Sequence, residues 1–142
     1  MLAGRCDHLL SCDVAAAAVR AAARRTRDLP NLRVERRRVP GQWPSGRFDL
    51  IVFSEILYYF GDSDLEQVLD YGVGALRPGG TLLAVHWRHP VAEYPRTGDE
   101  VHQALASHPA WNRVAEHTEA DFIAEVYLRG AAVSVAEATG LV

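Results

Sequence analysis

The 142-residue sequence contains no lysine, only two cysteines and no long apolar run. A membrane-spanning helix needs roughly 20 consecutive apolar residues. The first 13 residues also lack the charged start, apolar middle and small-residue cleavage site of a signal peptide. We therefore expect a cytoplasmic protein with no membrane partner. Cys6 and Cys12 are too few and too far apart for a zinc ribbon or a CxxC redox pair, so we expect free, buried thiols.

Positive charge is concentrated at the start of the chain. Residues 1–47 hold ten arginines and four acids, whereas residues 48–142 hold five arginines and fourteen acids, and the net charge is −3. Such asymmetry can mark a nucleic-acid surface. However, Arg20, Arg24 and Arg27 fall on one face of a predicted helix, and arginine without lysine can reflect genomic base composition. We therefore expect a solvated face and no nucleic-acid partner.

The apolar patterning predicts one domain, residues 1–142, in which strands and helices alternate. Strands are predicted at 8–13, 30–39, 48–55, 81–87, 111–119 and 121–130, and helices at 14–28, 62–76, 97–108 and in the tail 134–142. Asp13 is a plausible cap for the first helix, and Asp62 or Ser63 for the second. This order favours a mostly parallel sheet with helices on both faces.

Two apolar runs predict where the site lies. The run "FDLIVFSE" (48–55) is typical of a central strand that is covered on both faces. The run "TLLAVHW" (81–87) is a second buried strand, and it leads into "RHP". In α/β sheets, ligands bind outside the carboxyl ends of the strands. The polar and aromatic residues that follow these runs are therefore the candidate functional residues.

Three stretches together resemble the class I S-adenosylmethionine-dependent methyltransferases. They are Asp13 at a strand end, "FDLIVFSEILYYF" (48–60) and "LRPGGTLLAVHW" (76–87). More narrowly, "SEILYYF" and "HWRHPVAEYPRTGDEVHQAL" resemble the nodulation-type, NodS-like N-methyltransferases, which act on amino sugars in chitooligosaccharide chemistry. The resemblance runs from Leu2 to Val142. It implies a Rossmann-like, doubly wound and mostly parallel sheet with an antiparallel C-terminal strand pair.

The resemblance also implies a cofactor and a reaction. The cofactor is S-adenosylmethionine, and the methyl acceptor is the nitrogen of an amino sugar or oligosaccharide, or another small molecule. In this family a first strand and a glycine-rich turn, a form of E-x-G-x-G, should precede Asp13 by roughly 20 residues. Only twelve residues precede it here. We therefore expect an N-terminally truncated domain with two unpaired sheet edges that invite association. An inactive, truncated domain that acts as a binding or interaction module is the alternative function.

Four residues are implied to contact the cofactor. Asp13 would hold the ribose hydroxyls, because a carboxylate accepts two hydrogen bonds from a diol. Val39 follows the strand after which the family contacts adenine, although Arg38 stands where an acid is expected. Ser54 and Glu55 end the strand that reaches the methionine end. Glu55 would accept a hydrogen bond from the methionine amino group, orient a substrate amine, or pair with an arginine.

Four further residues are predicted to contact the methyl acceptor. Tyr58 would shape the acceptor pocket, and Arg88 follows the next strand at its mouth. Trp87 and Tyr94 are suited to stack on the apolar C–H face of a sugar ring. The alternative for each aromatic side chain is ordinary packing.

Two histidines are candidate general bases. A methyl acceptor amine must lose a proton, and imidazole has an unperturbed pKa close to neutrality. His86 is the first candidate and His102 the second. His86 and His89 also raise the question of a metal site. Three residues along a strand place the two side chains on opposite faces, and no acid–histidine cluster completes a site, so we expect no metal.

Overall fold

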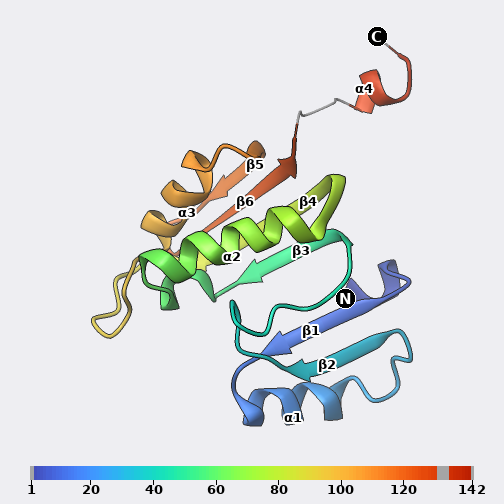
Figure 1. Cartoon of the computed structure of the whole chain (residues 1–142), viewed down its shortest axis with the longest axis vertical. Helices are drawn as coiled ribbons and strands as arrows, with labels where there is room; N and C mark the ends of the chain where they lie inside the picture. The colour runs from blue at the N-terminus through green and yellow to red at the C-terminus, as the bar shows by residue number, and fades with distance from the viewer. Residues whose placement is uncertain (1, 131–134, 142) are drawn as a thin grey trace. The chain divides into compact units, whose positions relative to one another are not determined.

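The computed structural model describes residues 2–130 and 135–141 (Figure 1). The chain divides into two compact units, Met1–Pro44 and Ser45–Val142. In the first unit, β1 (Leu9–Asp13) pairs in parallel with β2 (Leu32–Arg36), and α1 (Ala16–Arg25) packs against both strands. A short 3-10 turn, η1 (Leu2–Arg5), precedes β1. The amide nitrogen of Asn31 donates to the carbonyls of Ala3 and Cys6, both at 2.7 Å, and so ties this turn to the start of β2.

The start of α1 corrects one prediction. The helix is preceded by Ala15, and no side chain caps it. Asp13 instead accepts a hydrogen bond from the backbone N–H of Ala15 at 2.6 Å, which closes a turn before the helix begins. Both cysteines are free, as predicted, although each is only half-buried.

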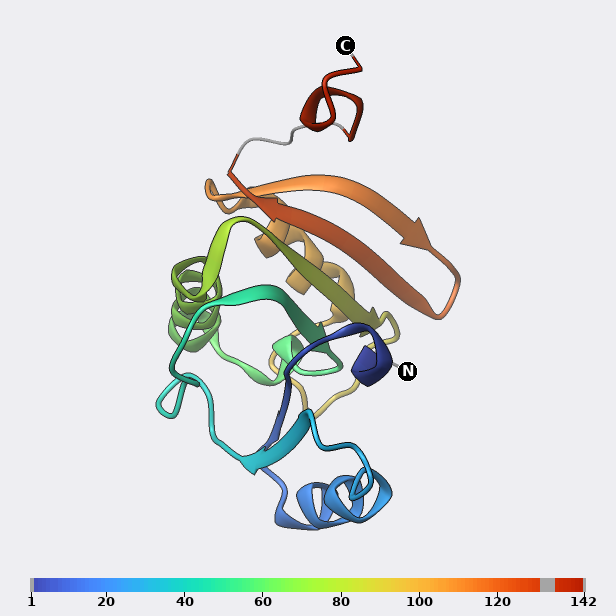
Figure 2. The same cartoon turned by 90° about the vertical axis from the view of Figure 1, so that its right-hand side faces the viewer.

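The second unit is built on a four-stranded sheet with the order β3-β4-β6-β5. The strands are β3 (Phe48–Ser54), β4 (Leu76–Trp87), β5 (Trp111–Thr118) and β6 (Phe122–Arg129). β3 and β4 are parallel, whereas β6 runs antiparallel to both β4 and β5. Figure 2 shows β5 and β6 as a hairpin beside β4. The predicted antiparallel C-terminal pair is therefore confirmed.

Two helices, α2 (Asp62–Ala75) and α3 (Gly98–Ser107), cover one face of this sheet. Phe53, Ala84 and Glu125 lie side by side across β3, β4 and β6, so they share a face. The Phe53 ring lies against Gly72 of α2, and Glu125 contacts His102 of α3. The core is therefore the layer between this face and the two helices.

Two features fix the start of α3 against the end of β4. Thr97 and Glu100 form a reciprocal capping box, in which Thr97 accepts from the backbone of Glu100 and the Glu100 carboxylate accepts from the backbone of Thr97. The second feature is Gly98, the residue after Thr97. A Cβ at this position would lie 2.2 Å from the Trp87 carbonyl oxygen and 3.3 Å from the His86 Cβ. Only glycine allows this close approach, which brings α3 onto the strand end.

Three predictions about element ends and covering are wrong. The run 48–55 was expected to be covered on both faces, but Leu50 and Val52 of β3 remain 37% and 38% exposed. Its apolar run is therefore not covered on both faces. β3 is an edge strand of its sheet among the described residues, which agrees with the expected unpaired edges. Neither Asp62 nor Ser63 caps α2, because the residue before the helix is Gly61 and no side chain accepts there. β4 begins at Leu76 instead of at the predicted residue 81, so the "RPGG" stretch lies inside the strand.

The predicted helical tail is found in part. α4 spans Val135–Ala138, while Ser134 and Val142 lie outside the described residues. One short element was not predicted, the 3-10 turn η2 (Leu57–Tyr59) directly after β3. This turn carries Tyr58 and Tyr59 beside the end of β3, so it belongs to the candidate site.

Candidate active site

The carboxyl ends of β3 and β4 meet at one edge of the sheet. Ser54 pairs with Val85, so the residues that follow, Glu55 on one strand and His86 and Trp87 on the other, lie next to one another. The backbone N–H of Glu55 donates to the Val85 carbonyl at 3.0 Å and extends the pairing by one step. The sequence predicted this meeting of Glu55, His86 and Trp87 from the parallel arrangement of their strands.

Glu55 is the most constrained residue of this edge. It has φ +56°, the left-handed region that non-glycine residues seldom adopt. Its Oε1 accepts a hydrogen bond from the backbone N–H of Trp87 at 2.9 Å, and its Oε2 accepts one from the Tyr58 hydroxyl. The residue is nevertheless exposed, and each oxygen keeps a further lone pair. Strain of this kind is concentrated at functional sites.

The hydroxyl of Tyr58 stays protonated beside this carboxylate. Burial raises the pKa of Tyr58, and the hydrogen bond to Glu55 and the negative charge of that carboxylate raise it further. A neutral phenol is a hydrogen-bond donor, so Tyr58 continues to hold Oε2 over the whole working range of pH. The Glu55–Tyr58 pair is therefore a fixed acceptor with one side open to solvent.

Three tyrosines form a cluster next to this pair. Tyr58 is stacked on Tyr94, with ring centroids 5.0 Å apart and an interplanar angle of 12°. Tyr59 lies 4.5 Å from the Tyr94 ring, and the two hydroxyls are 2.9 Å apart. Tyr58 is buried, whereas Tyr59 is 51% exposed. The structure thus joins η2 to the loop between β4 and α3, and it brings together the predicted Tyr58 and Tyr94.

His86 is buried in a chain of hydrogen bonds on the helix-covered side of the sheet. It is 0% exposed, and its Nε2 accepts from the backbone N–H of Leu57 at 3.2 Å. Its Nδ1 lies 3.1 Å from Nε2 of His102, and Nδ1 of His102 lies 2.5 Å from Oε2 of Glu125. Because a backbone N–H can only donate, the Leu57 amide fixes the tautomer of both rings. His86 carries its proton on Nδ1 and donates to His102, which in turn donates to Glu125.

Glu125 ends this chain as a buried carboxylate. It is 1% exposed, and besides His102 it accepts from the Tyr127 hydroxyl and from Nη1 of Arg113. Burial would raise the pKa of Glu125, but the hydrogen bonds from Tyr127, His102 and Arg113 outweigh it and hold the pKa below its usual range. The carboxylate therefore stays ionised, because its three donors replace the water it has lost.

This burial corrects the predicted role of both histidines. Burial, together with the neighbouring His102, lowers the pKa of His86 to about 3, so its ring stays neutral. A neutral imidazole has one lone pair, and the lone pair of His86 already accepts from Leu57. His102 is likewise buried, and both of its nitrogens are bonded. Because the nitrogens of both buried rings are already engaged within the protein, we assign neither ring as a general base.

Arg88 also differs from its prediction. Its Nε and Nη2 bind the two oxygens of Asp99 at 2.8 and 3.0 Å, and its Nη1 donates to the Glu119 carbonyl at 2.9 Å. All three guanidinium nitrogens are thus engaged, and they cross-link the end of β4, the start of α3 and the β5–β6 turn. We therefore assign Arg88 a structural role instead of a substrate contact. Trp87 remains 44% exposed at the same edge.

The other predicted cofactor residues lie at the ends of their strands. Asp13 is the last residue of β1 and is exposed, with Oδ1 bonded to Ala15. Val39 is half-buried in the turn after β2, which Gln42 closes by accepting from the Arg38 backbone at 2.8 Å. Ser54 ends β3 and is exposed. The arrangement of Asp13 and Val39 relative to Glu55 stays a prediction.

Sequence reasoning missed Glu125 and two of its partners, Arg113 and Tyr127. The signal was available in "FIAEVYLR", because alternate residues of a strand share a face. Ile123, Glu125 and Tyr127 all point to the buried side, so a charged side chain there had to find donors. The donor Arg113 comes from β5, and no sequence pattern predicts that it pairs with Glu125.

The comparisons with known proteins agree with this geometry. A family model described as a methyltransferase domain matches residues 1–82. A candidate methyltransferase from Pseudomonas syringae, of known crystal structure, is 43% identical, with 90% of this chain and 77% of that chain covered and a TM-score of 0.78. This chain belongs to the methyltransferase domain family. The methyltransferase domain therefore has the Rossmann-like α/β fold of the class I enzymes. No curated protein matches the chain.

More distant structures share the fold of this methyltransferase domain. The N-methyltransferase NodS from Bradyrhizobium japonicum WM9 is 24% identical, with a TM-score of 0.80, and 92% of this chain and 78% of that chain are covered. DhpI, in a complex with S-adenosylhomocysteine (SAH), is 18% identical, with a TM-score of 0.72, 91% of this chain and 69% of that chain. At these identities the likeness is one of fold alone.

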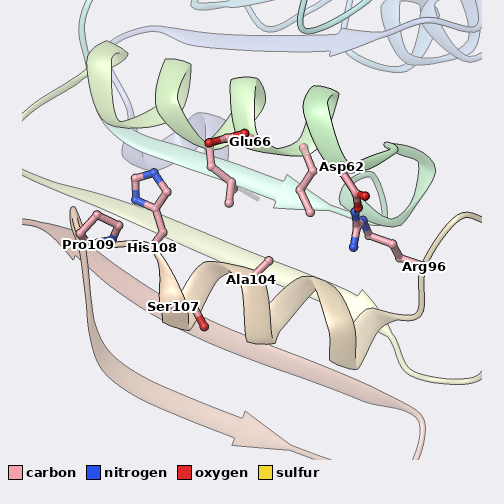
Figure 3. A pocket seen from close by; sticks show the side chains of 9 residues that line it. Asp62, Glu66, Arg96, Ala104, Ser107, His108 and Pro109 are labelled. Carbon is pink, nitrogen blue, oxygen red and sulfur yellow. The ribbon is translucent and has the colours of Figure 1, made fainter.

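A groove of about 310 Å³ lies between α2 and α3 of the methyltransferase domain (Figure 3). Leu65, Leu69 and Ala104 line it. In Figure 3 the Arg96 side chain points to Asp62, with which it forms an ion pair, and His108 lies at the opposite end. None of the predicted site residues lines this groove. No helix among the described residues has the length and apolar character that a membrane span requires.

Proposed function

We propose that this methyltransferase domain binds S-adenosylmethionine and transfers its methyl group to the amine of an amino sugar, an oligosaccharide or another small molecule. The observation that carries the proposal is Glu55, an exposed carboxylate in a left-handed conformation, held by Tyr58 and Trp87 at the end of β3. The N-methyltransferase NodS has also been solved in a complex with SAH, with a TM-score of 0.79 to this chain.

The residues at the strand ends suit this cofactor chemically. The cofactor has a ribose diol and a methionine amino group, which both seek hydrogen-bond acceptors. Asp13 has one carboxylate oxygen bonded to Ala15, and its Oδ2 accepts no hydrogen bond from the described residues, so it can accept from the diol. Val39 would lie on adenine, and Ser54 would contact the methionine end. When bound, the cofactor supplies a methyl group that its positively charged sulfur has already activated.

The acceptor would be held by Glu55 and the tyrosines. A carboxylate accepts an N–H hydrogen bond from a neutral amine, and this bond orients the nitrogen lone pair. Methyl transfer leaves an alkylammonium, which releases its proton to solvent at this exposed edge. The exposed Trp87 and the half-buried Tyr94, which the buried Tyr58 ring supports from one side by stacking, offer apolar faces to a sugar ring. Because the methyl group needs no further activation, the task of these residues is to position the acceptor, which contributes several kcal/mol to a lowered barrier.

The experiment is a methyl-transfer assay on glucosamine oligosaccharides with radiolabelled S-adenosylmethionine. We expect transfer by the wild-type chain and a loss of about 10²-fold in kcat/KM for Glu55→Gln, because the amide presents N–H groups where the amine donates. Glu66→Gln, an exposed substitution on α2, is the matched control and should retain wild-type activity. Equal activity of the Glu55→Gln variant would rule out the assigned role of Glu55.

A binding or interaction module is the second candidate function. The described strands form two sheets, β1-β2 and β3-β4-β6-β5, and no ladder joins them. One edge of β1 and one edge of β3 therefore lack a partner strand among the described residues. Open edges of this kind favour association with another chain. Light scattering of the wild-type chain at about 1 to 100 µM, the range that detects micromolar affinities, distinguishes the two candidates. A molecular mass that rises with concentration, without any methyl transfer, favours the module.

A further inference from the structure

The candidate site rests on a polar chain that the reaction itself does not use. The chain runs from the Leu57 amide through His86 and His102 to Glu125, and each step has one fixed donor and one fixed acceptor. The elements that supply it are η2, β4, α3 and β6. Buried polar groups are costly in an apolar core unless every one has a partner. A chain of two histidines and a carboxylate in this place therefore needs an explanation.

We propose that His86, His102 and Glu125 are positioning residues, which hold η2 so that Tyr58 stays bonded to Glu55. This inference rests on the proposed function of Glu55 as the residue that orients the acceptor. The hydrogen-bonded series lies next to both partners of that carboxylate along the sequence. Its first bond ends on Leu57, which precedes Tyr58 in the same short turn, and His86 precedes Trp87 on β4.

Ring contacts tie the chain to the tyrosine cluster as well. The His86 ring lies edge-on to Tyr58, with centroids 5.5 Å apart, and Tyr58 is stacked on Tyr94. A 3-10 turn of three residues has too few internal hydrogen bonds to hold its own position. The bond from Leu57 to His86 therefore fixes where η2 stands, and the ring contact fixes where the Tyr58 side chain points.

The direction in which each hydrogen bond is donated determines which ring nitrogen faces the Leu57 amide. Ionised Glu125 can only accept, so His102 must donate to it, and His86 must in turn donate to His102. This order leaves a lone pair at Nε2 of His86, which is the acceptor that the Leu57 amide requires. A reversed chain would place an N–H against the Leu57 N–H and displace the turn. Through the two imidazole rings, Glu125 thus determines that Nε2 of His86 is a hydrogen-bond acceptor for the Leu57 N–H.

The tautomer is the first test, and it needs neither a variant nor activity. Nitrogen-15 spectra of the imidazole rings in the wild-type chain should show His86 neutral, with its proton on Nδ1, from pH 8 to pH 5. The charged or titratable groups around it are Tyr58 of η2, His102 of α3, Arg113 of β5, and Glu125 and Tyr127 of β6. A proton on Nε2, or an imidazolium at pH 6, would overturn the proposal.

The second test uses two substitutions of His86 and a matched control. His86→Gln keeps an acceptor near the position of Nε2, His86→Leu removes it, and His117→Gln changes a histidine that is 63% exposed. Hydrogen exchange of residues 55–59 should be at least tenfold faster in the His86→Leu variant than in wild type, while the His86→Gln and His117→Gln variants remain close to wild type. A tenfold change corresponds to about one hydrogen bond.

Kinetics then connect the chain to the acceptor. For His86→Leu we expect kcat/KM for the acceptor to fall about 10²-fold, with the dissociation constant for S-adenosylmethionine within twofold of wild type, and His86→Gln to recover at least tenfold. If the wild-type chain transfers no methyl group, the proposed function fails, and exchange at residues 55–59 alone decides the positioning role. Unchanged exchange in a folded His86→Leu variant, or an equal loss in the His86→Gln and His86→Leu variants, would refute it.

Discussion

The neutral, buried His86 makes stability depend on pH in a direction that can be worked out. In the folded protein the pKa of His86 is lowered to about 3, mainly by burial and also by His102, whereas an unfolded histidine titrates near 6.5. Below pH 6.5 His86 binds a proton in the unfolded chain but stays neutral in the folded protein. The stabilisation is therefore complete above pH 6.5, and it is lost progressively as the pH falls towards 3.

The magnitude follows from the separation of these two values. Between pH 7.5 and pH 5 the unfolded histidine goes from almost wholly neutral to almost wholly charged, while the folded one stays neutral. One pKa unit corresponds to about 1.4 kcal/mol, so His86 alone lowers the free energy of unfolding by about 2 kcal/mol over this interval. The lowered pKa values of Asp99, Glu100 and Glu125 act mainly below pH 5, because their ordinary values are 3.8, 4.5 and 4.5.

The assay is urea unfolding of wild type and His86→Gln at half-unit steps from pH 7.5 to pH 5. Glutamine does not titrate, so the free energy of the variant should fall by about 2 kcal/mol less than that of wild type. His117→Gln, the same substitution at an exposed histidine, is measured beside it as the matched control. Parallel curves for wild type and His86→Gln would show that His86 takes up its proton in the folded protein as readily as in the unfolded chain, and the derived hydrogen-bond chain would then be wrong.

Three further outcomes are expected. Gly98→Ala should lower the free energy of unfolding by about 1–3 kcal/mol in urea titrations, because its Cβ would lie 2.2 Å from the Trp87 carbonyl oxygen, and an unchanged midpoint would contradict this packing. Tyr94→Phe should keep the KM for the methyl acceptor within about threefold of wild type, whereas Tyr94→Ala should raise this KM about tenfold, because the ring and not the hydroxyl is assigned the contact. A larger rise for Tyr94→Phe than for Tyr94→Ala would contradict this assignment. Asp13→Ala should weaken S-adenosylmethionine binding about tenfold by calorimetry, whereas unchanged affinity would remove Asp13 from the cofactor site.

The sequence predicted most elements of the fold because their apolar periods are regular. It placed the carboxyl ends of two neighbouring strands at "SE" and "HW", and the structure brings Glu55, His86 and Trp87 together there. The covering of β3 was not predictable, because an apolar run does not reveal which of its neighbours are present. Leu50 and Val52 look like core residues in the sequence, yet both are more than one-third exposed.

The roles of the polar residues were harder to predict than their positions. A histidine at a strand end reads as a base, and only the structure shows that Leu57 occupies its lone pair. Arg88 reads as a substrate contact, but it binds Asp99 and the Glu119 carbonyl. These partners come from α3 and the β5–β6 turn, at distances along the chain that local pattern does not encode. The strained backbone of Glu55 likewise has no sequence signature, since most left-handed residues are glycine or asparagine.

The most direct measurement of the central claim is calorimetric titration of the full chain with S-adenosylmethionine. We expect saturable heat with one cofactor bound per chain, followed by methyl transfer when an amino-sugar acceptor is added. An absence of heat at millimolar cofactor, from a chain that circular dichroism shows to be folded, would contradict it.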